Sequence, residues 1–396
     1  MRFAHSLNES LNLSVRSVYL DYNATTPPDS AVLADMEPFF TDIWGNPSSV
    51  HHIGRRARAC LDDFRDRAAT VFNSKPSEIV FTSGGTESNN LAVLGTARLL
   101  RDKGRHLITS TIEHHAVLHC FDYLERFEGF QVTRLPVDSS GRLDPEDLRN
   151  AITDSTTLVS VMAANNETGV IQPVAELGRI CRERGVIFHT DAVQWFGKEP
   201  FHDVAQFNAD LVSICAHKFH GPRGAGALYI RSPLQPHPTA FGGAHESERR
   251  AGTENLPAIA GLVSAMERFI PVPVFDRAVL EPLRIKIIDT VNSIESATFR
   301  GSLTHSLSNT VSFTVTGCDS IALMAALDME GICASSGSAC AAGSLEPSHV
   351  MRAMGVSEAE SNALVRFSLG RESTNEEIDY LLKLLPGILS QVKTPE

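Results

Sequence analysis

Five short segments of this sequence combine residue types that could hold and transform a small molecule. Glycines beside a helix start suit an anion such as a phosphate, and a histidine can stack on a ligand or move protons. A carboxylate that ends an apolar strand requires a cationic partner, and a lysine in that position can become a nucleophile toward carbonyl carbons. The segments are SGGTE at 83–87, EHH at 113–115, NNETG at 165–169, Asp191 with Gln194, and HK at 217–218.

Each segment taken alone also has an ordinary structural explanation. Gly and Thr at 83–87 are common in turns and helix caps, and the segment at 165–169 has the composition of a turn. Asp191 could cap a helix, and Lys218 could extend its ammonium group to solvent. No single segment therefore identifies a site.

The histidines leave a metal site open as a further alternative. His114, His115 and His119 are closely spaced, but no convincing acidic or cysteine partner lies near them in the sequence. A capping or surface histidine is the ordinary alternative. Together, however, the five segments supply an anion cradle, a stacking ring, an acid for a ring nitrogen and an amine for an aldehyde. Pyridoxal phosphate uses all four, so the combination favours this cofactor.

A second candidate site lies in the small-residue segment 333–344. Ala, Ser and Gly dominate it, and this composition predicts a mobile, exposed loop. A thiol on such a loop can approach a bound substrate and act as a nucleophile. Cys340 is therefore the candidate nucleophile, whereas Cys333 adjoins an apolar helix end and is expected to be structural.

The elements that must position these residues are short apolar strands, most of them separated by helices. Continuous apolar runs are typical of strands buried on both faces. Strand–helix alternation predicts an α/β fold with a mostly parallel sheet, whose ligands bind beyond the carboxyl ends of the strands. The predicted strands occupy 78–84, 106–110, 157–164, 186–191, 211–216 and 226–230, and two of the predicted helices occupy 86–100 and 174–184.

After about residue 265 the pattern changes to that of a smaller α+β unit. It contains predicted strands at 309–315 and 365–370, a helix at 319–331 and a final amphipathic helix from about residue 375. The boundary between the two units is the least certain feature, because element and domain boundaries are weakly encoded in a single sequence.

Composition excludes several classes of function. The chain has 396 residues, and its net charge of −12 disfavours a nucleic-acid or anionic-membrane binder. No apolar run approaches the ~20 residues that a membrane helix needs, and the polar N-terminus lacks a signal core, so a cytoplasmic protein is expected. The seven cysteines include no CxxC pair, which argues against a zinc ribbon or thioredoxin motif.

A series of motifs resembles the pyridoxal-phosphate-dependent cysteine desulfurases, the NifS- and IscS-like branch of the class-V aminotransferases. The SGSAC segment, followed by SLEPS, separates this branch from selenocysteine-lyase-like enzymes. The motifs are YLDYNATTP (19–27), GNPSSVH (45–51), FTSGGTESNN (81–90), EHHAV (113–117), NNETGVIQP (165–173), HTDAVQ (189–194), AHKFHGPRG (216–224), RRAGTEN (249–255), SSGSACAAGSLEPSHV (335–350) and RFSLGR (366–371).

The resemblance implies a fold-type-I pyridoxal-phosphate-dependent transferase that works as a homodimer. It implies a large cofactor-binding domain at 28–265 with a mainly parallel seven-stranded sheet. A smaller α+β domain at 266–396 would carry the Cys340 loop, and an N-terminal segment at 1–27 would join that smaller domain.

The resemblance also implies a role for each matching residue. Lys218 would form the imine with the cofactor aldehyde, His114 would stack on its ring and assist proton transfer, and Asp191 would pair with its ring nitrogen. Arg366 is expected to bind the substrate carboxylate, with Arg371 as the second choice. The full set of implied cofactor contacts is Gly85, Thr86, His114, Asn166, Asp191, Gln194, Cys215, His217, Lys218 and Thr253.

Three of these contacts need comment. Thr253 would reach the phosphate of the other subunit, which is why a homodimer is implied. Asn166 would lie near both the cofactor and the substrate. Cys215 stands where the family usually has a phosphate-binding serine, and a thiol donates hydrogen bonds poorly, so cofactor affinity could be lower here.

The implied reaction converts L-cysteine to L-alanine, with Cys340 attacking the sulfur and carrying it as a persulfide. The sulfur would pass to an acceptor such as an iron–sulfur scaffold or a tRNA-thiolation protein, and Cys340 could also ligate a transient iron–sulfur cluster. Two alternatives stay open at this point: another pyridoxal-phosphate enzyme on the same fold, such as an aminotransferase or selenocysteine lyase, and a non-enzymatic sulfur scaffold with a decayed cofactor site.

Overall fold

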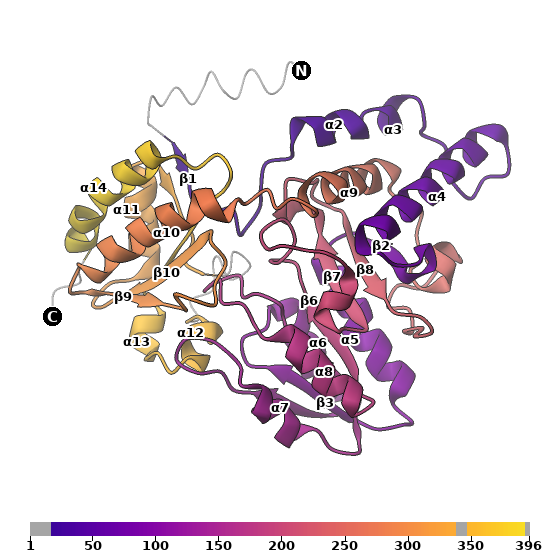
Figure 1. The fold of residues 1–396 in the computed structure, drawn as a ribbon, viewed down its shortest axis with the longest axis horizontal. Helices are drawn as coiled ribbons and strands as arrows, with labels where there is room; N and C mark the ends of the chain where they lie inside the picture. The colour runs from indigo at the N-terminus through magenta and orange to yellow at the C-terminus, as the bar shows by residue number, and fades with distance from the viewer. Residues whose placement is uncertain (1–16, 338–346, 393–396) are drawn as a thin grey trace.

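The computed structural model describes residues 17–337 and 347–392. Its centre is a seven-stranded sheet with the order β2-β8-β7-β6-β5-β3-β4 (Figure 1). Only β8 runs antiparallel to its neighbours β7 and β2, so the sheet is mainly parallel, as predicted. The strands are β2 (Ile79–Thr82), β3 (His106–Ser110), β4 (Gln131–Leu135), β5 (Thr156–Ser160), β6 (Ile187–Asp191), β7 (Leu211–Cys215) and β8 (Gly226–Ile230).

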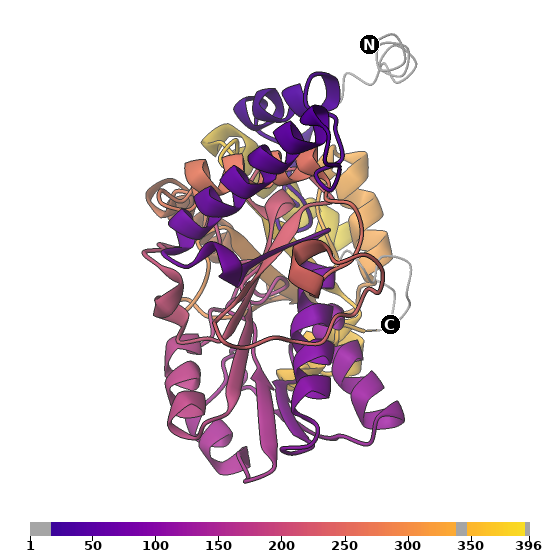
Figure 2. The same cartoon turned by 90° about the vertical axis from the view of Figure 1, so that its right-hand side faces the viewer.

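Helices cover both faces of this sheet (Figure 2). Because successive strand residues point to opposite faces, Ile79 and Phe81 of β2 join one apolar core while Val80 joins another. One face carries α5 (Gly85–Leu100) and α6 (His115–Phe127). The opposite face carries α2 (Ser30–Met36), α4 (His52–Phe72), α7 (Pro145–Ala151), α8 (Val174–Glu183) and α9 (Leu256–Phe269).

The C-terminal part of the chain forms a second apolar core around an antiparallel three-stranded sheet of the order β12-β10-β9. Helices α10, α11 and α14 supply most of its remaining apolar side chains. The elements of this part are α10 (Arg277–Asn292), β9 (Ala297–Arg300), β10 (Thr310–Val315), α11 (Ser320–Met329), β11 (Ile332–Cys333), α12 (His349–Ala353), α13 (Glu358–Ser361), β12 (Leu364–Ser368) and α14 (Asn375–Gln391).

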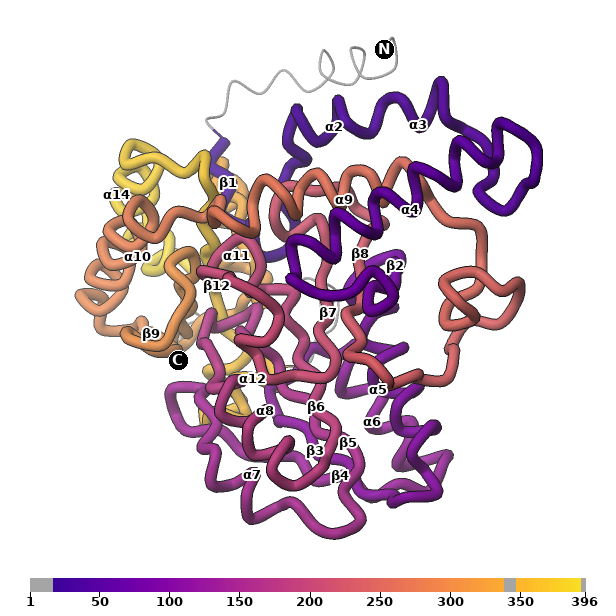
Figure 3. The backbone as a smooth tube through the Cα atoms, turned by 45° about the vertical axis from the view of Figure 1, so that its right-hand side comes forward, coloured from indigo at the N-terminus to yellow at the C-terminus, as the bar shows by residue number. Residues whose placement is uncertain are grey.

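The start of the chain belongs to this second core. Strand β1 (Val18–Tyr19) pairs in parallel with β11, so Val18 lies opposite Ile332. The same segment then crosses to the large sheet, and both ribbon and tube views show its indigo strand among orange and yellow elements (Figures 1 and 3). The exact domain limits at 27 and 265 stay a prediction.

Most predicted strands and helices occur within a few residues of their expected positions. The predicted strand at 78–84 is shorter, at Ile79–Thr82, because Gly84 has a φ of 153° and caps α5. The sequence reading missed β4 and β9, because partly exposed strands show no continuous apolar run. It also did not foresee that β8 reverses direction.

Candidate active site

The structure contains a cavity of about 200 Å³ at the carboxyl ends of the parallel strands. This is where an open α/β sheet binds its ligands. The loop after β1, the start of α5 and one arginine of β12 complete its wall. Its lining residues are Asn23, Ala24, Gly85, Thr86, Asn89, His114, Met162, Ala164, Asn166, Asp191, Val193, Gln194, Cys215, His217, Lys218 and Arg366.

The cavity gathers most of the residues that the sequence reading singled out. Every predicted cofactor contact except Thr253 lines it, and so does Arg366. Thr253 is exposed elsewhere on this chain. Cys340 lies outside the described residues.

Lys218 reaches the cavity from a 3-10 turn, Ala216–Lys218, that follows β7 directly. Its Nζ donates hydrogen bonds to two backbone carbonyls, Asn23 O at 2.7 Å and Ala24 O at 2.8 Å. Both of these acceptors are neutral backbone oxygens of the loop after β1. The amine is therefore placed to react with a carbonyl carbon in the cavity.

Asp191 ends β6 and is 6% exposed. Its Oδ1 accepts from the backbone N–H of Val193 at 3.0 Å, and its Oδ2 accepts from Asn89 Nδ2 at 2.6 Å. Burial raises the pKa of this carboxyl, although two hydrogen bonds and the nearby Lys218 oppose the shift. None of the ion pairs within 17–337 and 347–392 includes Asp191, so a cationic ring nitrogen would supply the partner that a buried carboxylate requires.

His114 is both a helix cap and a wall of the cavity. Its Nδ1 accepts the backbone N–H of Ala116 at 3.0 Å at the start of α6. Burial, with the nearby Lys218, lowers the pKa of His114 to about 4. The ring is therefore neutral near pH 7, and because Nδ1 is an acceptor its proton lies on Nε2.

The anion-binding end of the cavity is the start of α5. A Cβ added to Gly85 would come within 2.7 Å of Val193 Cγ2, so only glycine lets the backbone N–H groups face the cavity closely. His217 Nδ1 lies 3.1 Å from Thr25 Oγ1, and burial lowers the pKa of His217 to about 3, which keeps it neutral. Burial also raises the pKa of the Cys215 thiol. The end of the cavity thus offers neutral donors and a helix N-terminus, which suit a phosphate.

Arg366 is 1% exposed and also lines the cavity. Its guanidinium donates to Asp21 Oδ1 at 2.7 Å and to Asn166 O at 2.9 Å. Its Nε has no hydrogen-bond partner within the described part of the chain. Arg371, the second choice from sequence, pairs with Asp29 and Glu372 and does not line the cavity.

Two polar residues that line the cavity, Asn23 and Asn89, were not predicted from the sequence. Asn23 contributes its carbonyl to Lys218 and its side chain to Asn166 O at 3.2 Å. Asn89 holds Asp191 from the second turn of α5, and its own Oδ1 has no partner among the described atoms. Asn89 belongs to the FTSGGTESNN motif, so a signal existed, but its contact with Asp191 joins elements far apart in sequence.

A metal site at the histidines has no support in the described residues. No group of three or more His, Cys, Asp or Glu side chains there could hold a metal ion. His115 instead stacks on His119, with ring centroids 5.0 Å apart. No helix in the same part of the chain is long and apolar enough to cross a membrane.

Comparison with known proteins gives a consistent family. The aminotransferase class-V family matches residues 18–381. A cysteine desulfurase IscS from Methanosarcina thermophila is 45% identical over 385 residues, covering 97% of this chain and 95% of the relative. A cysteine desulfurase IscS from Dictyoglomus turgidum is 44% identical over 382 residues, with 96% of each chain covered.

The chain belongs to the class-V aminotransferases, in the cysteine desulfurase branch.

Solved structures agree with this assignment. A NifS-like protein superposes on this desulfurase with a TM-score of 0.87 at 38% identity, covering 95% of this chain and all of the other. The structure of SspA in complex with cysteine superposes with a TM-score of 0.77 at 36% identity, covering 90% of this chain and 99% of the other. The fold-type-I expectation is therefore confirmed.

Enzymes of this family depend on pyridoxal phosphate, and the cavity of this desulfurase fits that group. Asp191 is a buried carboxyl that forms no ion pair among the described residues, the α5 N-terminus is suited to a phosphate, and Lys218 offers an amine. These features match the ring nitrogen, the phosphate and the aldehyde of the cofactor.

Proposed function

We propose that this enzyme removes the sulfur atom from L-cysteine, releases L-alanine and holds the sulfur as a persulfide on Cys340. The observation that carries this proposal is the meeting of Lys218, Asp191 and the α5 N-terminus in one cavity, in a chain 45% identical to a cysteine desulfurase. When bound, pyridoxal phosphate supplies an electron sink for a carbanion at the substrate Cα.

In this proposal the chain's own residues bind the reactants and move protons. Lys218 Nζ first binds the cofactor and then removes the Cα proton of the substrate. Asp191 keeps the ring nitrogen protonated, and Asn89 holds the carboxylate in place through the 2.6 Å hydrogen bond. The neutral His114 would cover the ring and can donate a hydrogen bond from Nε2 to the reactants.

Arg366 would bind the carboxylate of L-cysteine. A guanidinium matches a carboxylate with two parallel hydrogen bonds. Substrate binding would then exchange with the contacts that Arg366 now makes to Asp21 and Asn166. Of these two partners, Asn166 lines the cavity and Asp21 does not.

The sulfur transfer itself is assigned to Cys340 by resemblance. Its thiolate would attack the sulfur of the substrate, and a new S–S bond would form as the Cβ–S bond breaks. The electron pair of the broken bond would stay on Cβ, which then takes up a proton to give alanine. The enzyme thiol and cysteine thus become an enzyme persulfide and alanine, with no external oxidant.

The partners belong to the same proposal. We infer a homodimer in which Thr253 of each chain serves the cofactor phosphate of the other, because Thr253 is exposed and away from its own cavity. The sulfur would pass to a cytoplasmic acceptor such as an iron–sulfur scaffold. Names of the relatives support this destination.

The test is a spectrum of the purified protein before and after L-cysteine, with alanine and sulfide assayed in the same tube under reductant. We expect a visible band from the bound cofactor that changes with cysteine, and equal amounts of alanine and sulfide. Selenocysteine and a keto-acid acceptor, run in parallel, separate a selenocysteine lyase or aminotransferase. A bound cofactor without sulfide release would exclude the proposed reaction.

A Cys340→Ala variant completes this test. It should keep the visible band, since the cavity is unchanged, but should form no persulfide. Persulfide formation by Cys340→Ala would refute the assignment of the nucleophile.

A further inference from the structure

A buried lysine, which the proposed mechanism does not use, contacts two residues that line the cavity. Lys198 is 2% exposed and lies in the turn after β6. Its Nζ donates to Asn23 Oδ1 at 2.6 Å and makes a short hydrogen bond to Gln194 Oε1. The Nζ atom also lies over the ring of Phe275, 5.2 Å from the ring centroid. Both oxygen partners belong to residues that line the cavity.

Lys198 has no direct carboxylate partner among the described residues to explain its burial. None of the ion pairs between those residues includes it; the neighbouring Glu199 pairs with Arg277 instead. Burial, with Lys218 and Arg366 nearby, lowers the pKa of Lys198 well below its ordinary value. Burying an amine in this way is unfavourable. The hydrogen bonds from Lys198 to the side-chain amides of Asn23 and Gln194 must therefore offset this cost.

The physical consequence of these bonds is a fixed direction for each amide. The oxygen and nitrogen of a side-chain amide have nearly the same shape, and the hydrogen-bond network decides which way it points. An ammonium has three donors and no acceptor, and a neutral amine still has two donors. Lys198 can therefore donate to both oxygens in either protonation state.

The rest of the network agrees with this orientation. Gln194 Nε2 donates to Asn23 O at 3.0 Å, and Asn23 Oδ1 also accepts from Asn309 Nδ2 at 3.0 Å. Asn23 O is in turn the acceptor of Lys218 Nζ. Asn23 thus joins the two lysines, with Lys198 on its side chain and Lys218 on its main chain.

We propose that Lys198 is a positioning residue that holds the amide of Gln194 with its N–H side toward the cofactor. The inference rests on the proposed function and on the family resemblance, which implies that Gln194 contacts the phenolic oxygen of pyridoxal phosphate. That oxygen is an acceptor, so an amide oxygen turned toward it would repel it. Without Lys198, the buried Oε1 of Gln194 loses its donor, which is unfavourable, and only the hydrogen bond from Nε2 to Asn23 O still fixes the direction of the amide.

The test measures cofactor binding by the apoenzyme. Wild-type, K198M, Q194L and the double variant are stripped of cofactor and titrated with pyridoxal phosphate, and the dissociation constant and absorption maximum are recorded. We expect K198M to raise the dissociation constant about tenfold, or about 1.4 kcal/mol, and to shift the absorption maximum. In the Q194L background the same substitution should change the dissociation constant less than about threefold. If Lys198 acts through the Gln194 amide, its effect is lost once that amide is removed.

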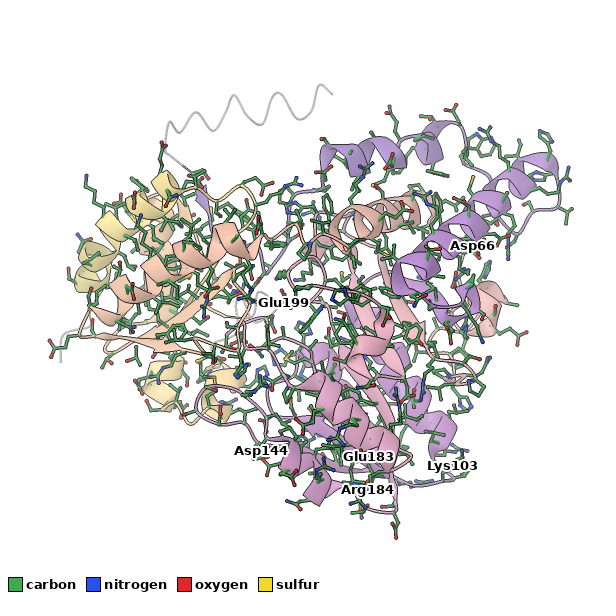
Figure 4. All side chains as sticks on the ribbon, in the orientation of Figure 1. Asp66, Lys103, Asp144, Glu183, Arg184 and Glu199 are labelled. Carbon is green, nitrogen blue, oxygen red and sulfur yellow. The ribbon has the colours of Figure 1, made fainter. Side chains whose placement is uncertain are left out.

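A matched control and a second variant separate an effect on cofactor binding from a general effect of misfolding. Lys103 is exposed at the edge of the molecule (Figure 4), and K103M should bind the cofactor as wild type does. K198Q keeps one donor group, so its dissociation constant should fall between those of wild type and K198M. If K198M does not fold, the cycle is run with K198Q.

Two results would overturn the inference. Equal effects of the Lys198 substitution in the wild-type and Q194L backgrounds would show that Lys198 acts as general packing. Unchanged binding and absorption in folded K198M would show that it does not act on the cofactor. A wild-type apoenzyme that takes up no pyridoxal phosphate would refute the proposed function itself, which the other two results leave intact.

Discussion

At the scale of single residues, Cys215 lines the cavity at a position where the family usually has a serine. Its thiol is buried with a raised pKa, so it is present as a neutral S–H group. A thiol is a weak hydrogen-bond donor. In the proposed cofactor site, phosphate binding would then depend on the α5 backbone and His217.

Cys215→Ser should therefore strengthen cofactor binding. A hydroxyl in the same place is a better donor, and one added hydrogen bond to a charged group contributes about 1.5–3 kcal/mol, so we expect a dissociation constant at least about tenfold lower. The measurement is titration of the apoenzyme with pyridoxal phosphate. Cys60→Ser, a partly buried cysteine outside the cavity, is the control. A weaker or equal affinity in Cys215→Ser would contradict this account.

Asp191→Asn should lower kcat while leaving the fold intact. The amide has nearly the shape of the carboxyl, but it cannot hold a proton on the ring nitrogen as a carboxylate does. Removing such a charge from a buried site typically reduces the rate by about 10²-fold or more. Steady-state release of alanine checks the rate, and circular dichroism checks the fold. A loss of less than about threefold would mean that Asp191 is not the partner of the ring.

The residues that sequence could indicate are those at the ends of strands. Lys218, Asp191 and His114 follow apolar runs directly, and parallel strands bring their carboxyl ends to one edge. Lys198 and Asn23 gave no such signal. Lys198 donates a hydrogen bond to the Asn23 side chain, and the Asn23 carbonyl accepts one from Lys218. Both bonds join residues far apart in the sequence, so no local pattern indicates them.

At the scale of elements, close packing of helices depends on particular glycines. A Cβ on Gly178 of α8 would come within 2.7 Å of the backbone oxygens of Phe207 and Asn208. Gly387 of α14 has open space at the same position. Close packing thus requires glycine at position 178 but not at position 387.

Gly178→Ala should destabilise the protein, and Gly387→Ala should stabilise it. Backbone cannot move aside cheaply, so the first change costs about 1–3 kcal/mol through overpacking. The second gains about 0.5–1 kcal/mol, because alanine loses less backbone entropy in a helix. Chemical denaturation of both variants beside wild type gives the free energies of unfolding. Changes of the same sign in the two variants would refute the packing argument.

The elements that sequence predicted poorly have a common cause. Strands β4 and β9 have exposed or half-exposed residues, so they lack the apolar run that marks a buried strand. The reversal of β8 follows from its connection to β7, which contains a 3-10 turn but no crossover helix. A pattern of apolar residues does not specify strand direction.

At the scale of the whole molecule, buried histidines make stability depend on pH. His189 is 0% exposed and lies between Ser160 Oγ at 2.8 Å and Ser213 Oγ at 3.0 Å. Burial lowers its pKa to about 3, from an ordinary value of 6.5. The unfolded chain binds a proton there below pH 6.5 while the folded chain does not. The stability that this residue contributes is therefore complete above pH 6.5 and is lost as pH falls toward 3.

His189→Gln should reduce the loss of stability in mild acid. Between about pH 7 and about pH 5 we expect the free energy of unfolding of wild type to fall by about 2 kcal/mol more than that of the variant. Glutamine can still bond to the serines but does not titrate. Urea denaturation of both proteins at several pH values provides the measurement. Parallel curves for the two proteins would exclude His189 as a source of the pH dependence.

The pairing of β1 with β11 has a consequence for how the enzyme matures in the cell. A ribosome releases Val18 long before Ile332, so the first strand must wait for its partner while the large sheet is already forming. Asp21 and Asn23 follow that strand and are tied to Arg366 and Lys218. The pocket is therefore closed last, when the chain is nearly complete. Newly made enzyme should gain its cofactor only after release from the ribosome, and a nascent chain that stalls before β11 would lack the strand pairing that holds the carbonyl acceptor of Lys218 in place.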